Sequence, residues 1–270
     1  MNKIILALDT TNIEEAINIV KKIKDKIFTI KLGLEFFNAH GKNGVKKFNE
    51  LGINNLMLDL KLKDIEAKIG TLSNPAKMPS FAWGIPIEYC VTGSKLAEIK
   101  GTICNKCYAG KGCYVFPVVR AMYEKRYQAL ELPEWVDYMA ELITQKYKNK
   151  KEEDRYHRWF DSGDVQSYSH LMKIFEVCEL TPHIKYWLAT REYHIIDQID
   201  VKDVPKKLCL RVSTTKVDSP QPKFWEWTSG VHKDKPAVGR ECPAPKQNGE
   251  CGSCRACWSR KVKQVSYKEH

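Results

Sequence analysis

Residues 184–192, Ile-Lys-Tyr-Trp-Leu-Ala-Thr-Arg-Glu, decide the fold class because a strand pattern runs directly into polar and charged side chains. The same pattern occurs at 156–164, which ends in Asp-Ser-Gly-Asp, and at 208–215, which ends in Ser-Thr-Thr. A helical pattern at 169–179 separates the strands at 156–160 and 184–188. Parallel α/β barrels and open sheets alternate strands with helices in this way and carry their sites at the carboxyl ends of the strands.

Charged side chains follow two of these strands. Asp161 and Asp164 end the first, and Arg191 and Glu192 end the second. Their groups are suited to holding the ribose, amino or carboxylate groups of a ligand. The alternative is that each one is a helix cap or a turn residue.

Four cysteines near the carboxyl end have the spacing C-x8-C-x2-C-x2-C. They are Cys242, Cys251, Cys254 and Cys257. Successive Cys-x-x-Cys steps in a glycine-bearing turn are typical of loops that hold an iron–sulfur cluster. Zinc is the alternative, because it also binds four thiolates.

An earlier group of cysteines follows a strand pattern at 81–87. It consists of Cys90, Cys104, Cys107 and Cys113. Three of these thiolates, those of Cys90, Cys104 and Cys107, would leave one iron of a [4Fe–4S] cluster open for S-adenosylmethionine. Alternatively, Cys113 closes the site as a fourth ligand. We predict that Cys178 and Cys209, which lie in apolar patterns, are core residues.

The segment from residue 70 to 270 resembles the phage gene-product-eighty-eight family over about 200 residues. The resemblance rests on the stretches 72–79, 104–109, 158–164, 187–192 and 251–258. The order of cysteine loop, aspartate-rich strand end and arginine-bearing strand end is similar, by analogy, to radical S-adenosylmethionine-like proteins.

Residues 1–65 also alternate between strand and helix patterns, with strands at 4–8, 27–32 and 56–60 and helices from Thr11 and over 42–51. Three stretches, 7–9, 31–37 and 58–65, resemble the first strands of orotidine 5′-phosphate decarboxylase. The resemblance implies that Lys61 donates a proton. It also implies that Asp9 binds the ribose, Lys31 and Asp59 complete a charge network, and Asp64 reaches across a dimer interface.

This segment departs from the family, which usually has His at the position of Lys63 and Pro-Asn-Thr at 66–68. The later strands of the barrel and its phosphate loop are not evident in the sequence. We therefore predict an α/β chain in two parts: a partial (β/α)-barrel fragment at 1–65, and a parallel barrel-like or partial-barrel domain with cysteine metal clusters at 70–270.

The composition indicates which partners and which cellular compartment are expected. The chain has 270 residues and a net charge of +11, from 44 Lys and Arg against 33 Asp and Glu. This charge admits a nucleic acid partner, and Trp159, Trp187, Trp225 and Trp227 are either a stacking surface or core. Ten cysteines without an export or membrane segment indicate a cytoplasmic protein with metal or redox chemistry.

These observations favour an iron–sulfur protein of phage origin with one or two [4Fe–4S] clusters. We interpret it as a radical S-adenosylmethionine-like enzyme of unknown substrate that is fused to the decarboxylase-like head. Two alternatives remain open, orotidine 5′-phosphate decarboxylase and a non-catalytic, zinc-stabilised binding protein. The dimer contact implied for Asp64 makes a homodimer the expected assembly of the decarboxylase alternative.

Overall fold

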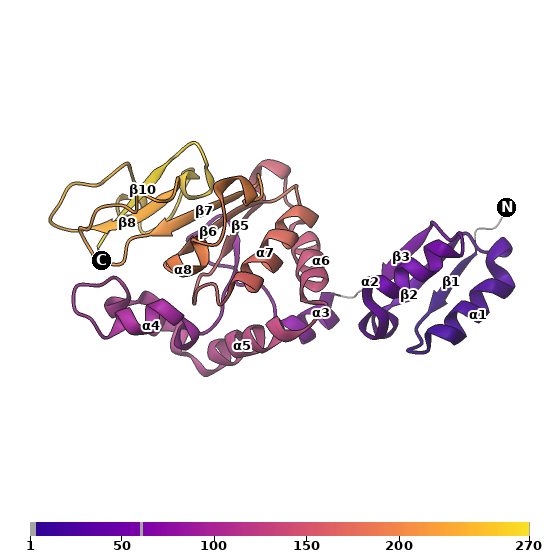
Figure 1. Ribbon diagram of the computed structural model, residues 1–270. Helices are drawn as coiled ribbons and strands as arrows, with labels where there is room; N and C mark the ends of the chain where they lie inside the picture. Colours follow the sequence, from indigo (N-terminus) through magenta and orange to yellow (C-terminus); the bar gives the residue numbers. More distant parts are fainter. Residues whose placement is uncertain (1–3, 60–61, 270) are drawn as a thin grey trace. The chain divides into compact units, whose positions relative to one another are not determined.

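The computed structural model describes residues 4–59 and 62–269. The chain divides into two compact units, Met1–Lys68 and Ile69–His270. Each unit has its own parallel sheet, so the predicted α/β class is confirmed. Figure 1 labels the helices and strands of both units.

The first unit contains a three-stranded parallel sheet in the order β1-β2-β3. Its strands are β1 (Ile5–Leu8), β2 (Thr29–Gly33) and β3 (Leu56–Asp59), and they are connected by α1 (Ile13–Ile23) and α2 (Leu34–Glu50). The helix α3 (Leu62–Ile69) follows β3. The side chain of Asn12 accepts hydrogen bonds from the backbone N–H groups of Glu14 and Glu15, which starts α1.

The helices bury one face of this small sheet. Ala16 and Val20 of α1 pack with Ile30 and Leu32 of β2 in one apolar cluster. By contrast, Ile5 and Met57 are about half exposed. We predicted the second helix at 42–51, but α2 begins eight residues earlier, at Leu34. It contains a break at Gly41 (φ 51°, ψ −147°), a left-handed conformation that glycine adopts without steric cost.

The second unit contains seven parallel strands in the order β4-β5-β6-β7-β8-β10-β9. Five successive strands are neighbours, which is consistent with a partial (β/α) barrel. The strands are β4 (Phe81–Trp83), β5 (Tyr156–Trp159), β6 (Lys185–Thr190), β7 (Leu208–Ser213), β8 (Thr228–His232), β9 (Arg240–Glu241) and β10 (Gln264–Lys268).

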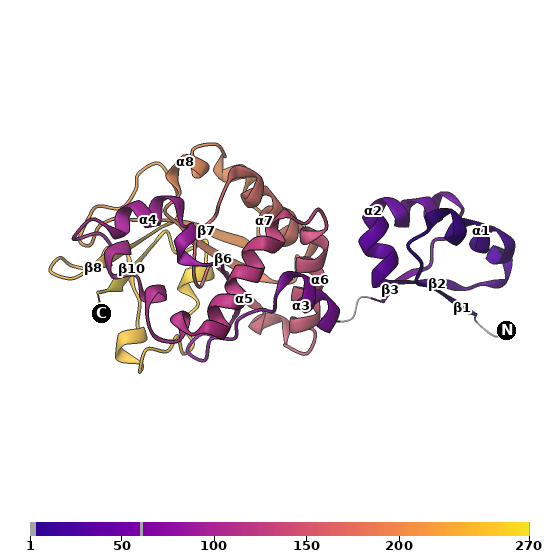
Figure 2. The ribbon, with the colours of Figure 1, turned by 90° about the horizontal axis from the view of Figure 1, so that it is seen from below.

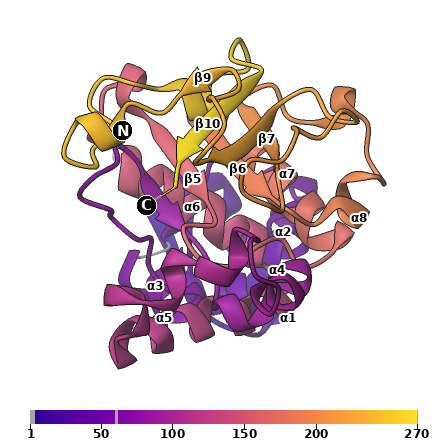
Figure 3. The ribbon, with the colours of Figure 1, turned by 90° about the vertical axis from the view of Figure 1, so that its left-hand side faces the viewer.

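The second unit also contains several helices. They are α4 (Val91–Ala97), α5 (Pro117–Gln128), α6 (Trp135–Tyr147), α7 (Tyr168–Leu180) and α8 (Tyr193–Ile196). Figures 1 and 2 show α6 and α7 side by side, and the two helices contact each other. In Figure 3, α4 lies below the strands β6, β7 and β10.

Aromatic side chains fill the core of the second unit. The ring of Trp83, which is fully buried, lies 5.5 Å from that of Trp135 and 5.9 Å from that of Trp159, centroid to centroid. Of the two interpretations of the tryptophans, core is the one observed, because the following four are all buried: Trp159, Trp187, Trp225 and Trp227. Cys178 and Cys209 are buried as well, which confirms their prediction as core residues.

The first strand of this sheet is shorter than we predicted. The strand pattern at 81–87 forms pairs only over Phe81–Trp83, because the chain then turns at Gly84 and Pro86 into a 3-10 helix, Ile87–Tyr89. No helix within residues 4–59 and 62–269 is long and apolar enough to cross a membrane.

We expect the second unit to fold without the first. All seven tryptophans lie between residues 83 and 258, and the large aromatic core belongs to the second unit. A chain that begins at Ile69 should therefore remain soluble and show the tryptophan-fluorescence unfolding midpoint of the full protein within experimental error. A lower midpoint or aggregation would show that the two parts form one cooperative fold.

Two buried histidines make the second unit sensitive to acid. Burial lowers the pKa of His157 and of His170 to about 3, whereas an unfolded histidine titrates near about 6.5. The unfolded state therefore binds more protons below pH ~6.5, and each histidine removes about 1.4 kcal/mol of stability per pH unit between ~6.5 and ~3.

The free energy of unfolding falls as the pH is lowered from 6.5 to 4.5. We expect this fall to be less steep in His170→Gln, by the contribution of one histidine. The measurement is guanidinium unfolding followed by tryptophan fluorescence at several pH values. Burial raises the pKa of Asp164 to about 6, which contributes a slope of opposite sign. That contribution is common to both proteins and cancels in the comparison. Equal slopes for the two proteins would contradict the prediction.

Candidate functional site

The first group of cysteines lies on the segment that follows β4. Cys90 occupies the cap position of α4, and Cys104 begins a 3-10 turn, Cys104–Lys106. The backbone N–H of Ile103 donates to the carbonyl of Thr215 at 3.0 Å, just beyond the end of β7. This bond brings the cysteine segment to the carboxyl ends of the parallel strands, the edge where α/β proteins bind ligands.

Cys90 interacts electrostatically with two other thiols of this segment. Burial raises the pKa of the Cys90 thiol, and Asp164, Cys107 and Cys104 raise it further. Burial also raises the pKa of Cys104, while the guanidinium of Arg191 acts in the opposite direction. Cys113 is exposed, whereas Cys90, Cys104 and Cys107 are half-buried. Burial therefore distinguishes Cys113 from the other three cysteines of the segment.

Gly93 leaves room beside two of these sulfurs. A Cβ atom at this position would lie 3.5 Å from the Sγ of Cys90 and 3.8 Å from the Sγ of Cys104. It would also lie 2.8 Å from the Cβ of Cys90, closer than packed atoms approach. A side chain at residue 93 would thus crowd Cys90 and fill the space beside both sulfurs.

The acidic strand-end residues support the cysteine segment. Glu192 is fully buried, and its carboxylate accepts hydrogen bonds from the backbone N–H (2.9 Å) and the hydroxyl of Thr92, two residues after Cys90. Asp164 accepts from the backbone N–H groups of Val165 at 2.8 Å and Arg191 at 2.9 Å. These carboxylates therefore connect the ends of β5 and β6 to each other and to α4.

Asp161 is buried and is hydrogen-bonded to the cysteine segment. Its Oδ2 accepts from the hydroxyl of Tyr123 at 3.1 Å, and its backbone carbonyl accepts from the hydroxyl of Tyr108 at 2.6 Å. Its Oδ1 has no hydrogen-bond partner among the described residues. Gly163 (φ 79°) permits this turn, because a Cβ there would lie 2.7 Å from the carbonyl oxygen of Ile85.

The carboxyl-terminal cysteines form a second neighbourhood. Burial raises the pKa of Cys251, and Cys242 and Cys254 raise it further. The hydroxyl of Tyr267 in β10 lies 3.2 Å from the Sγ of Cys257. The turn that carries these cysteines contains Gly252 at φ 51°, a conformation that side chains rarely adopt.

Arg158 on β5 interacts with both cysteine groups. Its Nη2 donates to the hydroxyl of Tyr108, the neighbour of Cys107, at 2.6 Å. The same guanidinium acts to lower the pKa of Cys251 in the other group, where burial has the larger, opposite effect. It lies 4.8 Å from the ring centroid of Trp187.

The thiols are neighbours without forming a closed ligand set. Across residues 4–59 and 62–269, no three His, Cys, Asp or Glu side chains come close enough together to hold a metal ion. The metal clusters that we expected from the spacing therefore stay a prediction.

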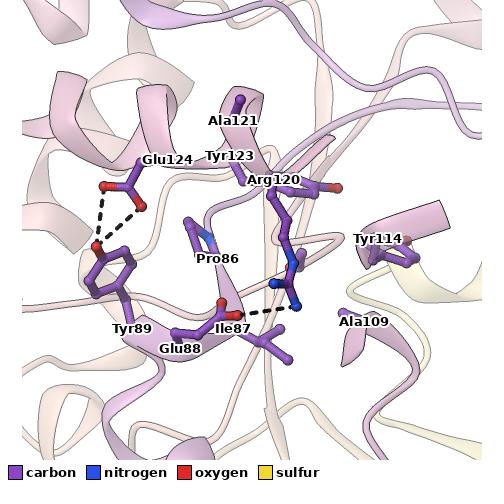
Figure 4. A pocket seen from close by; sticks show the side chains of 11 residues that line it. Pro86, Ile87, Glu88, Tyr89, Ala109, Tyr114, Arg120, Ala121, Tyr123 and Glu124 are labelled. Atoms are coloured by element: carbon purple, nitrogen blue, oxygen red, sulfur yellow. Dashed lines mark hydrogen bonds and ion pairs between the residues drawn. The ribbon is translucent and has the colours of Figure 1, made fainter. Parts of the chain in front are cut away.

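A pocket of about 350 Å³ adjoins the first cysteine segment (Figure 4). The hydroxyl of Tyr89 donates to both carboxylate oxygens of Glu124 at 3.2 Å. An exposed ion pair joins Arg120 and Glu88 at 3.9 Å, a contact that is worth little in water. The pocket is lined by two carboxylates, one guanidinium and tyrosine rings. This lining suits a ligand with hydrogen-bond donors and a flat apolar part.

The first unit holds part of the decarboxylase-like array. Asp9 directly follows β1 and lies against Gly33 at the end of β2, and Gly33 pairs in register with Asp59 of β3. Lys31 lies two residues before Gly33 and is half-buried. Asp64 lies in the first turn of α3. Lys61 lies outside the described residues, as does the side chain of Asp59.

Several residues that shape these sites were not predicted from the sequence. Thr92 and Gly93 lie in an ordinary helical pattern, and only the fold shows that they meet Glu192 and the sulfurs. Arg211 could have been identified from the sequence, because it is a charged residue within the otherwise apolar strand pattern Leu-Cys-Leu-Arg-Val.

Comparisons with known proteins match two overlapping parts of the chain to two different families. Residues 2–85 match the family described as Orotidine 5′-phosphate decarboxylase / HUMPS family. An orotidine 5′-phosphate decarboxylase of Wolbachia sp. subsp. Brugia malayi is 51% identical over 65 residues, 24% of this chain and 28% of that protein. The corresponding protein of Ehrlichia canis is 49% identical over 69 residues, 26% of this chain and 30% of that protein. The chain thus spans less than a third of the length of these relatives.

No solved structure matches the chain. Residues 59–260, about three quarters of the chain, match the family described as Gene product 88, and this match includes both cysteine groups and their strand-end partners. The chain therefore belongs to the gene product 88 family.

Proposed function

We propose that the second unit is an iron–sulfur protein of radical S-adenosylmethionine-like type. Cys90, Cys104 and Cys107 would hold a [4Fe–4S] cluster with one open iron. Such a cluster, when bound, supplies the electron that cleaves S-adenosylmethionine. The observation that supports the proposal is the position of Cys90, Cys104 and Cys107, which are half-buried while Cys113 is exposed, on a segment bonded to the carboxyl edge of a parallel sheet.

The chain's own residues have separate roles in this proposal. Glu192 and Asp164 fix the cysteine segment and the strand ends through the backbone bonds described above. Arg191 contributes positive charge beside Cys104, which favours thiolates there. The uncompensated Oδ1 of Asp161 is the acceptor that an amino or hydroxyl group of the cofactor would satisfy.

The carboxyl-terminal cysteines Cys242, Cys251, Cys254 and Cys257 would hold a second cluster. Zinc at both sites remains the rival assignment, and it would make the chain a metal-stabilised binding protein. The test is iron, zinc and acid-labile sulfide analysis of anaerobically purified protein, together with its visible spectrum. Iron with matching sulfide and an absorbance that bleaches on reduction supports the proposal, whereas zinc without sulfide refutes it.

A second candidate function is orotidine 5′-phosphate decarboxylation. It is supported by the similarity of residues 2–85 to that family and by the meeting of Asp9, Gly33 and Asp59 at one sheet edge. A three-stranded sheet supplies only part of the eight-stranded barrel of such enzymes. A direct assay decides this candidate: turnover that Lys61→Ala abolishes supports it, and no turnover, or turnover unchanged by Lys61→Ala, excludes it.

A further inference from the structure

Arg211 occupies the centre of the second unit's sheet. It lies in β7, between Leu210 and Val212, and its side chain is fully buried. A buried guanidinium is costly unless its donors are satisfied and its charge is balanced. The surroundings of Arg211 satisfy its hydrogen-bond donors but do not balance its charge.

The hydrogen bonds of Arg211 all go to backbone carbonyl oxygens. Five of the acceptors lie in the segment 256–263, which contains Cys257 and follows the other cysteines. The acceptors are Ala256 (2.9 Å), Cys257 (3.1 Å), Ser259 (3.0 Å), Val262 (2.8 Å), Lys263 (3.2 Å) and Thr228 (3.2 Å).

These bonds determine the path of the cysteine segment. A guanidinium has five N–H donors in a rigid plane, so its acceptors must lie in or near that plane. The carbonyls of Ala256 and Cys257 accept from Nη2 and Nε, the two nitrogens on one side of the guanidinium. Arg211 therefore sets the backbone at Cys257, and with it the start of this side chain.

The charge of Arg211 is not balanced by a carboxylate. Within residues 4–59 and 62–269, none of the ion pairs includes Arg211. Arg126, the other fully buried arginine, differs because Asp161 acts as its charged neighbour. Carbonyl dipoles satisfy the donors of Arg211, but they leave its net charge inside the protein.

We propose that Arg211 is the counter-ion and positioning residue of a metal centre formed by Cys242, Cys251, Cys254 and Cys257. Four thiolates around a divalent metal ion or a [4Fe–4S] cluster are net dianionic. Such a centre supplies the negative charge that Arg211 otherwise lacks. The inference rests only on the part of the proposed function that assigns metal to these four cysteines, and not on S-adenosylmethionine.

The test isolates the carboxyl-terminal site in the full chain. Cys90, Cys104 and Cys107 are replaced by alanine, so that a failure of the first site cannot affect the result. Co²⁺ is then titrated into the reduced protein, because its thiolate charge-transfer band reports coordination by cysteine. Arg211→Lys keeps the charge and loses the planar donors, whereas Arg211→Met loses both.

We expect Arg211→Lys to weaken Co²⁺ binding several-fold and Arg211→Met to weaken it at least tenfold. Arg126→Met is the matched control, because it removes a buried arginine that hydrogen-bonds Thr71 and Gly84 instead of the cysteine segment. This variant should lower the unfolding midpoint and leave the Co²⁺ affinity unchanged. If Arg211→Met does not fold, Arg211→Gln replaces it as the uncharged variant.

Three outcomes would overturn the inference. Without a charge-transfer band in the parent protein, the four cysteines are not a metal site. Equal affinities for Arg211→Lys and the uncharged variant exclude the counter-ion role, and wild-type affinity for Arg211→Lys excludes the positioning role. A metal-loaded carboxyl-terminal site without S-adenosylmethionine cleavage would refute only the proposed function of the first site.

Discussion

A protein in which Cys104 and Cys107 are both replaced by alanine is expected to lose roughly half of its bound iron and sulfide, the share of one of two clusters. Cys104 begins a single 3-10 turn and Cys107 directly follows it, and the thiol of Cys104 lies near Cys90 beside Gly93. Removing two of three thiolates leaves too few ligands for a cluster. Iron and sulfide analysis with the visible spectrum measures the loss.

Cys113→Ala is the matched control for that experiment. Cys113 belongs to the same segment but is exposed, whereas the other three cysteines are half-buried. The Cys113→Ala protein should retain the full iron content if the cluster has an open iron. An equal loss of iron in Cys113→Ala would show a closed four-cysteine site, and such a site cannot bind S-adenosylmethionine through iron. An unchanged iron content in the double variant would contradict the metal assignment altogether.

Gly93→Ala probes the same site without removing a ligand. The added methyl group would lie 2.8 Å from the Cβ of Cys90 and within 3.8 Å of two sulfurs. We expect Gly93→Ala to lower the iron content, because the methyl group crowds Cys90 and the space beside both sulfurs. An unchanged iron content would contradict a cluster ligated by Cys90 at this position.

The central strands could be predicted from the sequence because their side chains are buried on both faces. Every residue of β7 is buried, and β6 is buried at four of its six positions, so both appear as apolar runs. Parallel strands also bring polar ends to one edge, which is why Asp164, Arg191 and Glu192 were predicted to lie together. In the structure, the backbone N–H of Arg191 donates to Asp164 and that of Thr92 donates to Glu192, so both carboxylates hold backbone segments in place.

The remaining strands lacked such a pattern. β8 (Thr-Ser-Gly-Val-His) and β10 (Gln-Val-Ser-Tyr-Lys) are mostly polar, and β10 inserts between β8 and β9, against the order of the chain. That pairing depends on long-range contacts that no local propensity encodes. The carbonyl acceptors of Arg211 are similarly remote, 45 to 52 residues further along the chain for the segment 256–263.

Trp83→Ala is expected to have the largest effect on stability. Its ring is fully buried and lies within 6.0 Å, centroid to centroid, of four others: Trp135, Trp159, Phe160 and His170. Replacing a buried tryptophan by alanine removes apolar burial and leaves a cavity, which typically costs about 3–5 kcal/mol. Guanidinium unfolding followed by the fluorescence of the other tryptophans measures this loss in the second unit alone, because the first unit contains none.

Phe116→Ala is the control, because this aromatic side chain is 56% exposed and its removal should change stability by about 0.5 kcal/mol or less. Trp83 also connects the core to the site: its carbonyl accepts from the backbone N–H of Phe160, and Gly84 follows it on the way to Cys90. We therefore expect Trp83→Ala to weaken metal retention together with stability. A loss below about 1 kcal/mol, much less than the removal of a buried tryptophan typically costs, would show that this aromatic cluster is not the centre of the fold.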